Sequence, residues 1–305
     1  MQPAIRVELH PAVIRSNIAR IVQETKVPVI AVVKADAYGL GLRDVIPAID
    51  DLVAGYYLFQ PREVIATAGH RLTRKSFIAA WCDDSQVDEL LSHRIRPAAW
   101  SVDQAMRWRS CDPVLAVDTG QQRFACPPEQ IDAVLAAGGC REAFTHASSV
   151  DQARHFQAIT AGRSLVRHAA GSSLLEIAEA RFDAVRPGFA LYRGSVRVTT
   201  HLIDARDSRG PAGYTGFIAP RHGVIPGGYS NGLAAGVCMV NGTRRRILEI
   251  GMQTAFVELG PTDRAGDEVT LLGDGLTEDD VAKSWGCGRH EALYRLARCG
   301  IRVQV

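Results

Sequence analysis

Short apolar runs alternate with polar stretches of helical spacing from the N-terminus to about residue 190. The apolar runs are 28–33 (PVIAVV), 53–59 (VAGYYLF), 76–81 (SFIAAW) and 113–117 (PVLAV). The helix-like stretches lie at 11–24, 84–92 and 127–137. A continuous apolar run of strand length predicts a strand buried on both faces, as in a parallel sheet. The alternation therefore predicts a parallel α/β fold, with a (β/α)8 barrel as the leading architecture.

The texture of the sequence changes after Tyr192. Strand-like runs appear at 236–241, 247–250, 255–259 and 268–272, with no long helical pattern between them. A helical pattern returns only at 277–299. We therefore predict a barrel domain over residues 10–195 and a mainly β domain over 196–305, which a strand at 4–9 is expected to join.

Composition excludes several classes of protein. Lys plus Arg number 35 against 33 Asp plus Glu, so the net charge of +2 gives no electrostatic reason to expect a nucleic-acid partner. No apolar stretch approaches the ~20 residues of a membrane span, and residues 1–10 carry no signal pattern, so a cytoplasmic protein is the default expectation. No Gly-rich nucleotide motif is present.

The cysteine pattern argues against a disulfide framework and against a zinc site. The seven cysteines are odd in number, scattered and without a CxxC pair. They are Cys82, Cys111, Cys126, Cys140, Cys238, Cys287 and Cys299. We read them as small buried thiols and expect no metal site.

The sharpest local feature is AVVKADAYGLG at 31–41, which places Lys34 at the end of a buried strand. Desolvation lowers the pKa of an amine, and a neutral lysine can attack an aldehyde to form an imine. Catalytic side chains also gather at the carboxyl ends of barrel strands. On these residues alone, a lysine that merely reaches from a strand end to solvent is an equally good interpretation.

The same segment closely resembles the cofactor motif of alanine racemases, AVVKANAYGHG. The resemblance implies that Lys34 carries pyridoxal phosphate and that Tyr38 contacts its phosphate. Asp36 and Leu40 depart from the motif without touching the reactive lysine.

Further segments resemble the family in the same order along the chain. They are VDTGQQRF (117–124), FTHASSVD (144–151), HAAGSS (168–173), VRPGFALYRG (185–194), AGYTG (212–216), GGYSNG (227–232) and GDEVTLLG (266–273). The cofactor contacts that this resemblance implies are Lys34, Tyr38, Arg123, His146, His168, Ser172, Arg186, Gly188, Phe189 and His290. The implied substrate contacts are Arg123, Tyr229 and Met252.

Racemisation needs two acid–base groups on opposite faces of the α-carbon. The resemblance implies Lys34 for one face and Tyr214 for the other, with the tyrosine supplied by a partner subunit, hence a homodimer with shared active sites. It also implies that Arg186 faces the pyridine nitrogen and that His168 orients Arg186 through a hydrogen bond. Because Arg does not readily lose a proton, that nitrogen would stay unprotonated, which favours reprotonation over decarboxylation or transamination.

Three departures lie near the expected site. Ala116 stands where many members have a lysine, Gln253 replaces an aspartate, and His290 replaces a phosphate-binding tyrosine. The chain is also shorter than its family. The expected substrate is therefore alanine or a larger amino acid. Two alternatives stay open: another pyridoxal-phosphate reaction (decarboxylase, lyase or transaminase), or a protein that binds the cofactor with little turnover.

Overall fold

A computed structural model describes residues 4–83 and 87–305 of the chain. Two compact units are present. The barrel unit comprises residues 14–37 and 41–191, and the β unit comprises residues up to 13, residues 38–40 and residues 192–305. Of the helix expected at 84–92, residues 84–86 lie outside the described residues.

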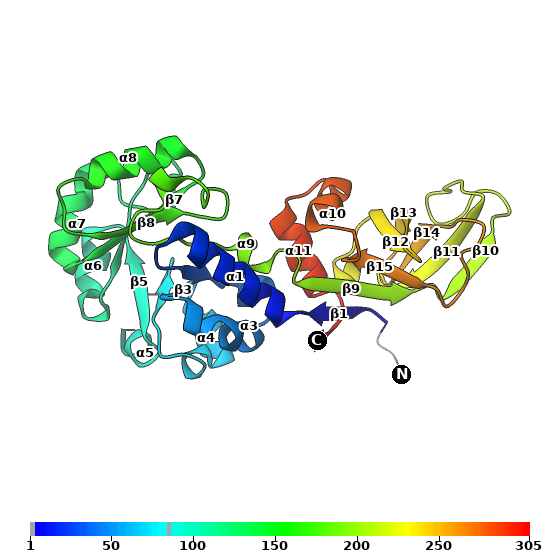
Figure 1. The fold of residues 1–305 in the computed structure, drawn as a ribbon, viewed down its shortest axis with the longest axis horizontal. Coiled ribbons are helices and arrows are strands. Elements are labelled where there is room, and N and C mark those ends of the chain that lie inside the picture. Colours follow the sequence, from blue (N-terminus) through cyan, green and yellow to red (C-terminus); the bar gives the residue numbers. More distant parts are fainter. Residues whose placement is uncertain (1–3, 84–86) are drawn as a thin grey trace. The chain divides into compact units, whose positions relative to one another are not determined.

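Seven parallel strands follow one another in sequence order around the barrel unit. They are β2 (Ile30–Val32), β3 (Gly55–Leu58), β4 (Phe77–Ala79), β5 (Ile95–Ala99), β6 (Val114–Ala116), β7 (Glu142–Ala147) and β8 (Val166–Ala170). The longer helices around them are α1 (Pro11–Thr25), α3 (Leu42–Ile49), α4 (Arg62–Thr67), α5 (Val87–Ser92), α6 (Val102–Arg107), α7 (Ile131–Gly138) and α8 (Val150–Thr160) (Figure 1). The predicted parallel α/β fold is confirmed.

Residues 183–187 close the barrel between its first and last strands. Val185 bridges Val29 beside β2, and Ala184 bridges His168 in β8, both in parallel. The Ile30 amide donates to the Val185 carbonyl at 2.9 Å on one side. On the other side the Arg186 amide donates to the Ala170 carbonyl at 2.7 Å. This segment is thus the eighth strand of the predicted barrel, and it delivers Arg186 to the site.

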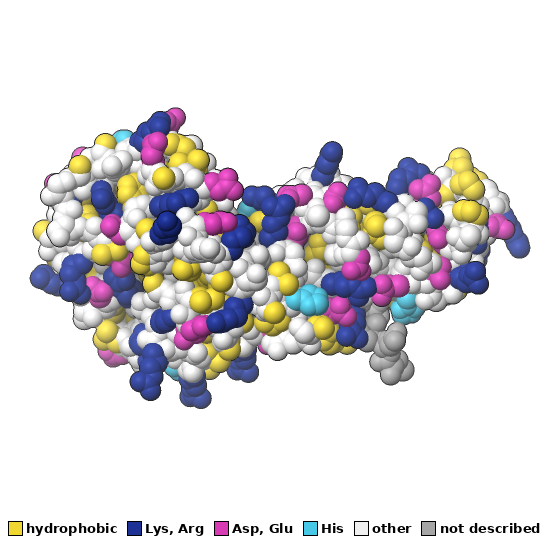
Figure 2. Space-filling view, viewed as in Figure 1, with side chains coloured by type: hydrophobic (Ala, Val, Ile, Leu, Met, Phe, Trp, Pro, Cys, Tyr) yellow, Lys and Arg dark blue, Asp and Glu magenta, His cyan; other side chains and the backbone are white. Residues whose placement is uncertain are grey.

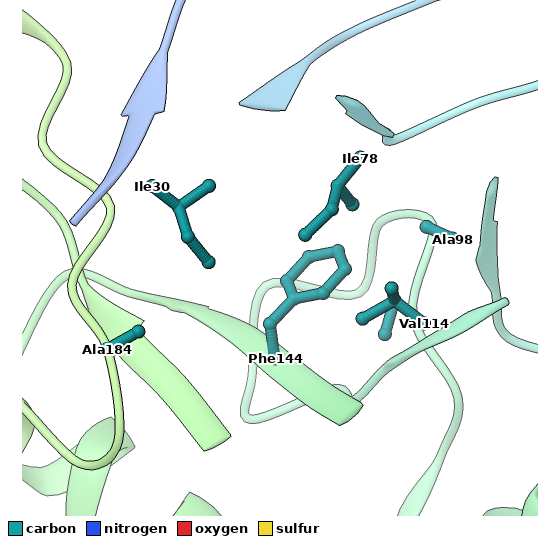
Figure 3. Packing of buried hydrophobic residues seen from close by; sticks show 7 residues of the cluster. Ile30, Ile78, Ala98, Val114, Phe144 and Ala184 are labelled. Atoms are coloured by element: carbon teal, nitrogen blue, oxygen red, sulfur yellow. The ribbon is translucent and has the colours of Figure 1, made fainter. Parts of the chain in front are cut away.

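The barrel interior is filled by side chains from most of its strands. The cluster contains Ile30, Ile78, Ala98, Val114, Ala116, Phe144 and Ala184. Figure 3 shows the Phe144 ring among Ile30, Ile78 and Val114. One large ring surrounded by branched and small residues fills the narrow interior, so the barrel is a packed core and not a pore.

A single left-handed turn follows β2. The segment Lys34–Tyr38 (α2) has φ of 55°, 55° and 53° at Ala35, Asp36 and Ala37. Left-handed backbone costs a non-glycine residue about 1–2 kcal/mol, so the surrounding contacts must hold this turn in place. One such contact is the Leu42 amide, which donates to Asp36 Oδ1 at 2.8 Å at the start of α3. The turn carries the chain from Lys34 to Tyr38.

The β unit is built on one nine-stranded sheet in the order β10-β11-β14-β13-β12-β15-β9-β1-β16. Its strands are β1 (Arg6–Leu9), β9 (Val196–His201), β10 (Asp204–Asp207), β11 (Arg221–Pro226), β12 (Gly236–Val240), β13 (Thr243–Ile250), β14 (Thr254–Glu258), β15 (Glu268–Leu272) and β16 (Ile301–Gln304). The N-terminal strand β1 pairs with β9 and β16. The predicted mainly β C-terminal part is therefore confirmed.

The helical pattern predicted at 277–299 forms two helices. They are α10 (Glu278–Trp285) and α11 (Arg289–Ala297), preceded along the chain by the short α9 (Phe189–Tyr192). Gly286 adopts φ of 65° at the end of α10, a left-handed conformation that ends helices and that glycine adopts without strain. Among the described helices, none has the length and apolar character needed to cross a membrane.

Candidate active site

The carboxyl ends of the barrel strands carry the predicted barrel-unit site residues. Lys34 follows β2, Arg123 lies in the segment after β6, His146 lies one residue before the end of β7, Ser172 follows β8 and Arg186 lies in the closing strand. The positive charges of Lys34, Arg123 and Arg186 all act on His146. The structure therefore gathers residues that are far apart in sequence at one end of the barrel.

Lys34 is an exposed residue whose amine is electrostatically destabilised as a cation. Its side chain is exposed, yet desolvation by the surrounding protein lowers its pKa, and the charges of Arg123 and Arg186 lower it further. Glu63 opposes that shift. A lysine that merely reaches into solvent would not lie among other cations. The surroundings therefore favour a reactive amine.

Glu63, which the sequence interpretation missed, anchors the loops beside Lys34. Its Oε1 accepts hydrogen bonds from the Phe59 and Gln60 amides, both at 3.1 Å. Its Oε2 accepts one from the Asp36 amide at 3.3 Å. The carboxylate thus ties the left-handed turn after Lys34 to the loop after β3.

Arg186 is buried between two aromatic rings. Its guanidinium carbon lies 4.9 Å from the ring centre of Tyr57 and 4.5 Å from that of Phe144. Its Nη2 donates to the Thr145 carbonyl, while its buried Nε has no hydrogen-bond partner among the described residues. Burial lowers the pKa of Arg186. A buried donor without an acceptor is costly, so this nitrogen points to a ligand acceptor.

The expected hydrogen bond between His168 and Arg186 is wrong. His168 Nε2 lies 2.9 Å from Glu142 Oε1, and its Nδ1 has no partner among the described residues. Burial lowers the pKa of His168 to about 4 against the opposing effect of Glu142. The neutral ring has one N–H, which the contact with the Glu142 carboxylate places on Nε2, so Nδ1 is left as an acceptor that receives no hydrogen bond from Arg186 among the described residues.

Desolvation and then the charges of Arg186, Lys34 and Arg123 lower the pKa of His146 to about 4. His146 is thus neutral at pH 7, and the positive charge in this part of the barrel comes from one lysine and two arginines. Such a concentration of positive charge suits an anionic ligand.

Ser172 and the backbone around the start of α9 form a small polar cradle. The Ser172 hydroxyl oxygen accepts hydrogen bonds from the Gly188 amide at 3.0 Å and the Ala190 amide at 3.1 Å. Its own hydrogen is then directed elsewhere, as a phosphate contact requires. The Gly188 amide, expected on a phosphate, bonds to Ser172 in this structure. Phe189 begins α9 beside this cradle.

Tyr38 and His290 lie together in the β unit, as their expected common contact with a phosphate requires. Their ring centres are 6.0 Å apart, and the Tyr38 ring is 4.8 Å from that of Tyr192. Burial raises the pKa of Tyr38 to about 12, so its hydroxyl stays protonated and can donate. The ring N–H of a histidine can also donate, so His290 keeps a hydrogen-bond donor where the family has a tyrosine.

Tyr214, Tyr229 and Met252 also share one part of the β unit. Tyr214 is 89% exposed, Met252 60% and Tyr229 57%. A Cβ on Gly251 would lie 3.8 Å from Tyr214 Cε2, and the Tyr229 amide donates to the Gly251 carbonyl at 2.9 Å. The segments that carry the predicted second base and the predicted substrate contacts are thus neighbours.

The packing of the barrel interior explains why position 116 is an alanine and not a lysine. It is 1% exposed and belongs to the apolar cluster inside the barrel. A lysine at this position would need polar partners that the cluster does not provide. Any support of Arg123 by a residue at position 116 is therefore absent in this chain.

These features define a β/α barrel with a cluster of positive charge around one lysine, joined in one chain to a β unit that presents an exposed tyrosine. The family described as alanine racemase, N-terminal domain, matches residues 9–196. The chain belongs to the alanine racemase family, as the sequence motifs predicted.

Relatives and solved structures agree over almost the whole chain. The alanine racemase of Shewanella oneidensis is 27% identical over 97% of this chain and 98% of its own. That of Syntrophobacter fumaroxidans is 28% identical, covering 96% and 95%. The biosynthetic alanine racemase from Pseudomonas aeruginosa has the same fold, with a TM-score of 0.91 and 23% identity over all of both chains. The Bartonella henselae alanine racemase with covalently bound pyridoxal phosphate gives 0.88 at 20% identity, covering 99% of each chain.

Proposed function

We propose that this protein is a pyridoxal-phosphate-dependent amino-acid racemase with alanine as a substrate. The observation that carries the proposal is Lys34, an exposed residue whose pKa is lowered by desolvation and by Arg123 and Arg186. The alanine racemases to which the chain is similar support the reaction and its substrate. The pyridoxal phosphate bound covalently in the Bartonella henselae enzyme supports the cofactor.

The described residues fit pyridoxal phosphate. Lys34 would hold its aldehyde carbon and Ser172 would contact its phosphate, to which the family resemblance adds Tyr38 and His290. The unpartnered Nε of Arg186 suits the pyridine nitrogen, which is an acceptor when unprotonated. An excess of positive charge around Lys34 matches the anionic phosphate and the substrate carboxylate.

The reaction divides between the cofactor and two side chains. Pyridoxal phosphate, when bound, supplies the conjugated ring that acidifies the α-carbon. Lys34, with its lowered pKa, can take or return a proton on one face. Tyr214 serves the opposite face. Arg186 keeps its own proton, so it does not give one to the ring nitrogen, which favours racemisation over transamination or decarboxylation.

The active protein is a homodimer with shared sites in this proposal. Tyr214 and Ile218 are 89% and 81% exposed. Figure 2 shows hydrophobic side chains gathered at the tip of the loop between β10 and β11. Large exposed apolar side chains that occur together mark an interaction surface, and a second copy of this chain is the partner that the resemblance implies.

An aromatic cluster at the carboxyl ends of β3 to β6 favours side chains larger than a methyl group as well. Its members are Phe59, Trp81, Trp100 and Phe124. The ring centre of Phe124 is 5.9 Å from that of Phe59 and 5.5 Å from that of Trp100. Phe124 follows Arg123, the implied carboxylate contact. We infer that larger apolar amino acids are also accepted.

The cytoplasm is the proposed compartment. All seven cysteines are free, and six of them are buried. Unpaired thiols are typical of a reducing compartment, where disulfides are rare.

The test is to incubate the holoenzyme with each L-amino acid in heavy water and to analyse the α-position and its configuration. Racemisation predicts the D-enantiomer with deuterium on the α-carbon. Loss of carbon dioxide or formation of a keto acid as the main product would instead assign another pyridoxal-phosphate reaction. Cofactor binding without exchange would indicate a protein that has lost turnover.

A further inference from the structure

Glu249 is a buried carboxylate in the β unit without a cationic partner among the described residues. It lies in β13 and is 6% exposed. The pairing of β13 with β14 shifts register between Ile247 and Glu249, which marks a bulge. Bulges redirect a side chain, and they occur often beside active sites.

Among the described residues, this carboxylate accepts hydrogen bonds from Tyr214 and Thr215 alone. The Tyr214 amide donates to Oε1 at 2.8 Å, and the Thr215 amide donates to Oε2 at 2.7 Å. The Thr215 hydroxyl donates to Oε2 as well. Burial raises the pKa of Glu249, but these bonds outweigh it and hold the pKa below its usual value. Hydrogen bonds to an ionised acceptor are among the stronger ones in proteins.

The loop is shaped to admit the carboxylate. Gly213 adopts φ of 70°, and a Cβ there would lie 2.7 Å from Glu249 Oε1 and 2.8 Å from Oε2. The Ala212 amide donates to the Phe217 carbonyl at 3.0 Å and closes the turn. Only glycine at 213 allows both the backbone conformation and the approach of Glu249.

The Tyr214 ring is 89% exposed, so packing does little to fix it within this unit. Its backbone is fixed mainly through the amides of residues 214 and 215. A group that transfers a proton must be held within a fraction of an ångström of its working position.

We propose that Glu249 is the positioning residue for Tyr214, and that it acts by clamping the backbone of Tyr214 and Thr215 in the orientation needed for proton transfer. This inference rests on the proposed role of Tyr214 as the second base. Glu249 itself touches neither substrate nor cofactor in this account. Its loss should therefore impair the half-reaction of Tyr214 and spare that of Lys34.

The test compares Glu249→Gln with the matched control Glu258→Gln. Glu258 lies on the neighbouring strand β14 and forms an ion pair with Arg246. An amide offers one acceptor oxygen and turns an NH2 toward the loop amides. We expect α-proton exchange in heavy water to fall about tenfold or more for the enantiomer that Tyr214 serves. This loss is smaller than the roughly 10²–10⁴-fold loss of rate expected when the base itself is removed. Exchange of the other enantiomer should stay within about twofold, and Glu258→Gln should change neither.

Hydrogen exchange of the protein without cofactor gives a readout that does not depend on activity. The peptide that contains residues 212–217 should exchange faster in Glu249→Gln than in the parent, because its amides lose a charged acceptor. Thr215→Val should show part of both effects, and Thr215→Ser should restore the parent behaviour.

Equal loss of exchange for both enantiomers, or unchanged amide exchange in this peptide, would overturn the inference. The Tyr214→Phe variant separates the two levels of the account. If Tyr214→Phe impairs one enantiomer and Glu249→Gln impairs neither, the positioning role fails alone. If Tyr214→Phe itself changes nothing, the assignment of the second base fails with it.

Discussion

Arg186 is the buried side chain proposed to determine which reaction the cofactor performs. The stacking of its guanidinium between Tyr57 and Phe144 and its hydrogen bond to the Thr145 carbonyl leave it little freedom. The unpartnered Nε is therefore held in a fixed direction. A permanently charged donor there can bond to a ring nitrogen without protonating it.

Arg186→Glu should raise transamination relative to racemisation, because a carboxyl group can share a proton with the ring nitrogen and make the ring a better electron sink. The measurement is the amount of keto acid formed per D-amino acid from the same L-substrate. Arg154→Glu, on the exposed face of α8, is the control and should keep the parent ratio. An unchanged ratio in Arg186→Glu would count against the assignment of Arg186.

His168 should make the protein lose stability in mild acid. Its pKa is about 4 in the folded protein, whereas an unfolded histidine titrates near ~6.5. Between these pH values the unfolded chain binds more protons, so the free energy of unfolding falls as pH falls. One such group contributes at most ~1.4 kcal/mol per pH unit.

Urea unfolding at a series of pH values measures this effect. His168→Gln should flatten the pH dependence between about 6.5 and 4, while His155→Gln, on the exposed side of α8, should not. Parallel curves for His168→Gln and the parent would show that His168 does not titrate as described.

The catalytic candidates could be predicted from sequence and their supporting carboxylates could not. Lys34 and Arg186 each lie in a contiguous motif, so the neighbouring residues in the sequence are enough to identify them. Glu63, Glu142 and Glu249 act across 27, 26 and 35 residues of chain to reach Asp36, His168 and Tyr214. A local sequence pattern does not show which residues meet across so many positions. For this reason Arg186 was expected as the partner of His168, and Glu142 was missed.

At the scale of elements, the left-handed turn at Lys34–Tyr38 stores strain, because four consecutive non-glycine residues have positive φ. Ala35 is exposed and has φ of 55°. Ala35→Gly removes the clash of its Cβ but makes the unfolded chain more flexible, so we expect a net gain of up to about 1 kcal/mol in the free energy of unfolding.

The matched control is Ala133→Gly in the ordinary right-handed helix α7, which should cost about 0.5–1 kcal/mol. Urea unfolding of both variants provides the comparison. A loss of stability in Ala35→Gly equal to that in Ala133→Gly would show that the turn is not strained in solution.

Strand prediction succeeded where strands are uniformly apolar and failed where polar residues interrupt them, as in β5, β7 and β8. The runs at β2, β3, β4 and β6 could be recognised by their buried residues. By contrast, β7 contains Thr145 and His146, and β8 contains Arg167 and His168. Their polar residues break the apolar run because they serve the open end of the barrel or pair with neighbours, so function hides the strand from a periodicity argument.

At the scale of the whole molecule, a shared site predicts complementation between two inactive variants. In a heterodimer of Lys34→Ala and Tyr214→Phe, one site would lack both groups and the other would have both. Mixing the two proteins under conditions of subunit exchange should thus restore one of the two sites in each heterodimer.

Racemisation of alanine after mixing measures the restored activity, and mass spectrometry of differently labelled subunits confirms exchange. Each variant mixed with itself is the control. If heterodimers form and remain inactive, Lys34 and Tyr214 of one site come from the same subunit.

The proposed cofactor binding and reaction depend on Lys34, and the chain suits a direct test because it has only four lysines: Lys26, Lys34, Lys75 and Lys283. Protein expressed with ample pyridoxal phosphate should be yellow. Reduction with borohydride and peptide mapping by mass spectrometry should then find the pyridoxyl adduct on the peptide that contains Lys34, and Lys34→Ala should carry none. An adduct on another lysine, or no bound cofactor in well-folded protein, would contradict the account.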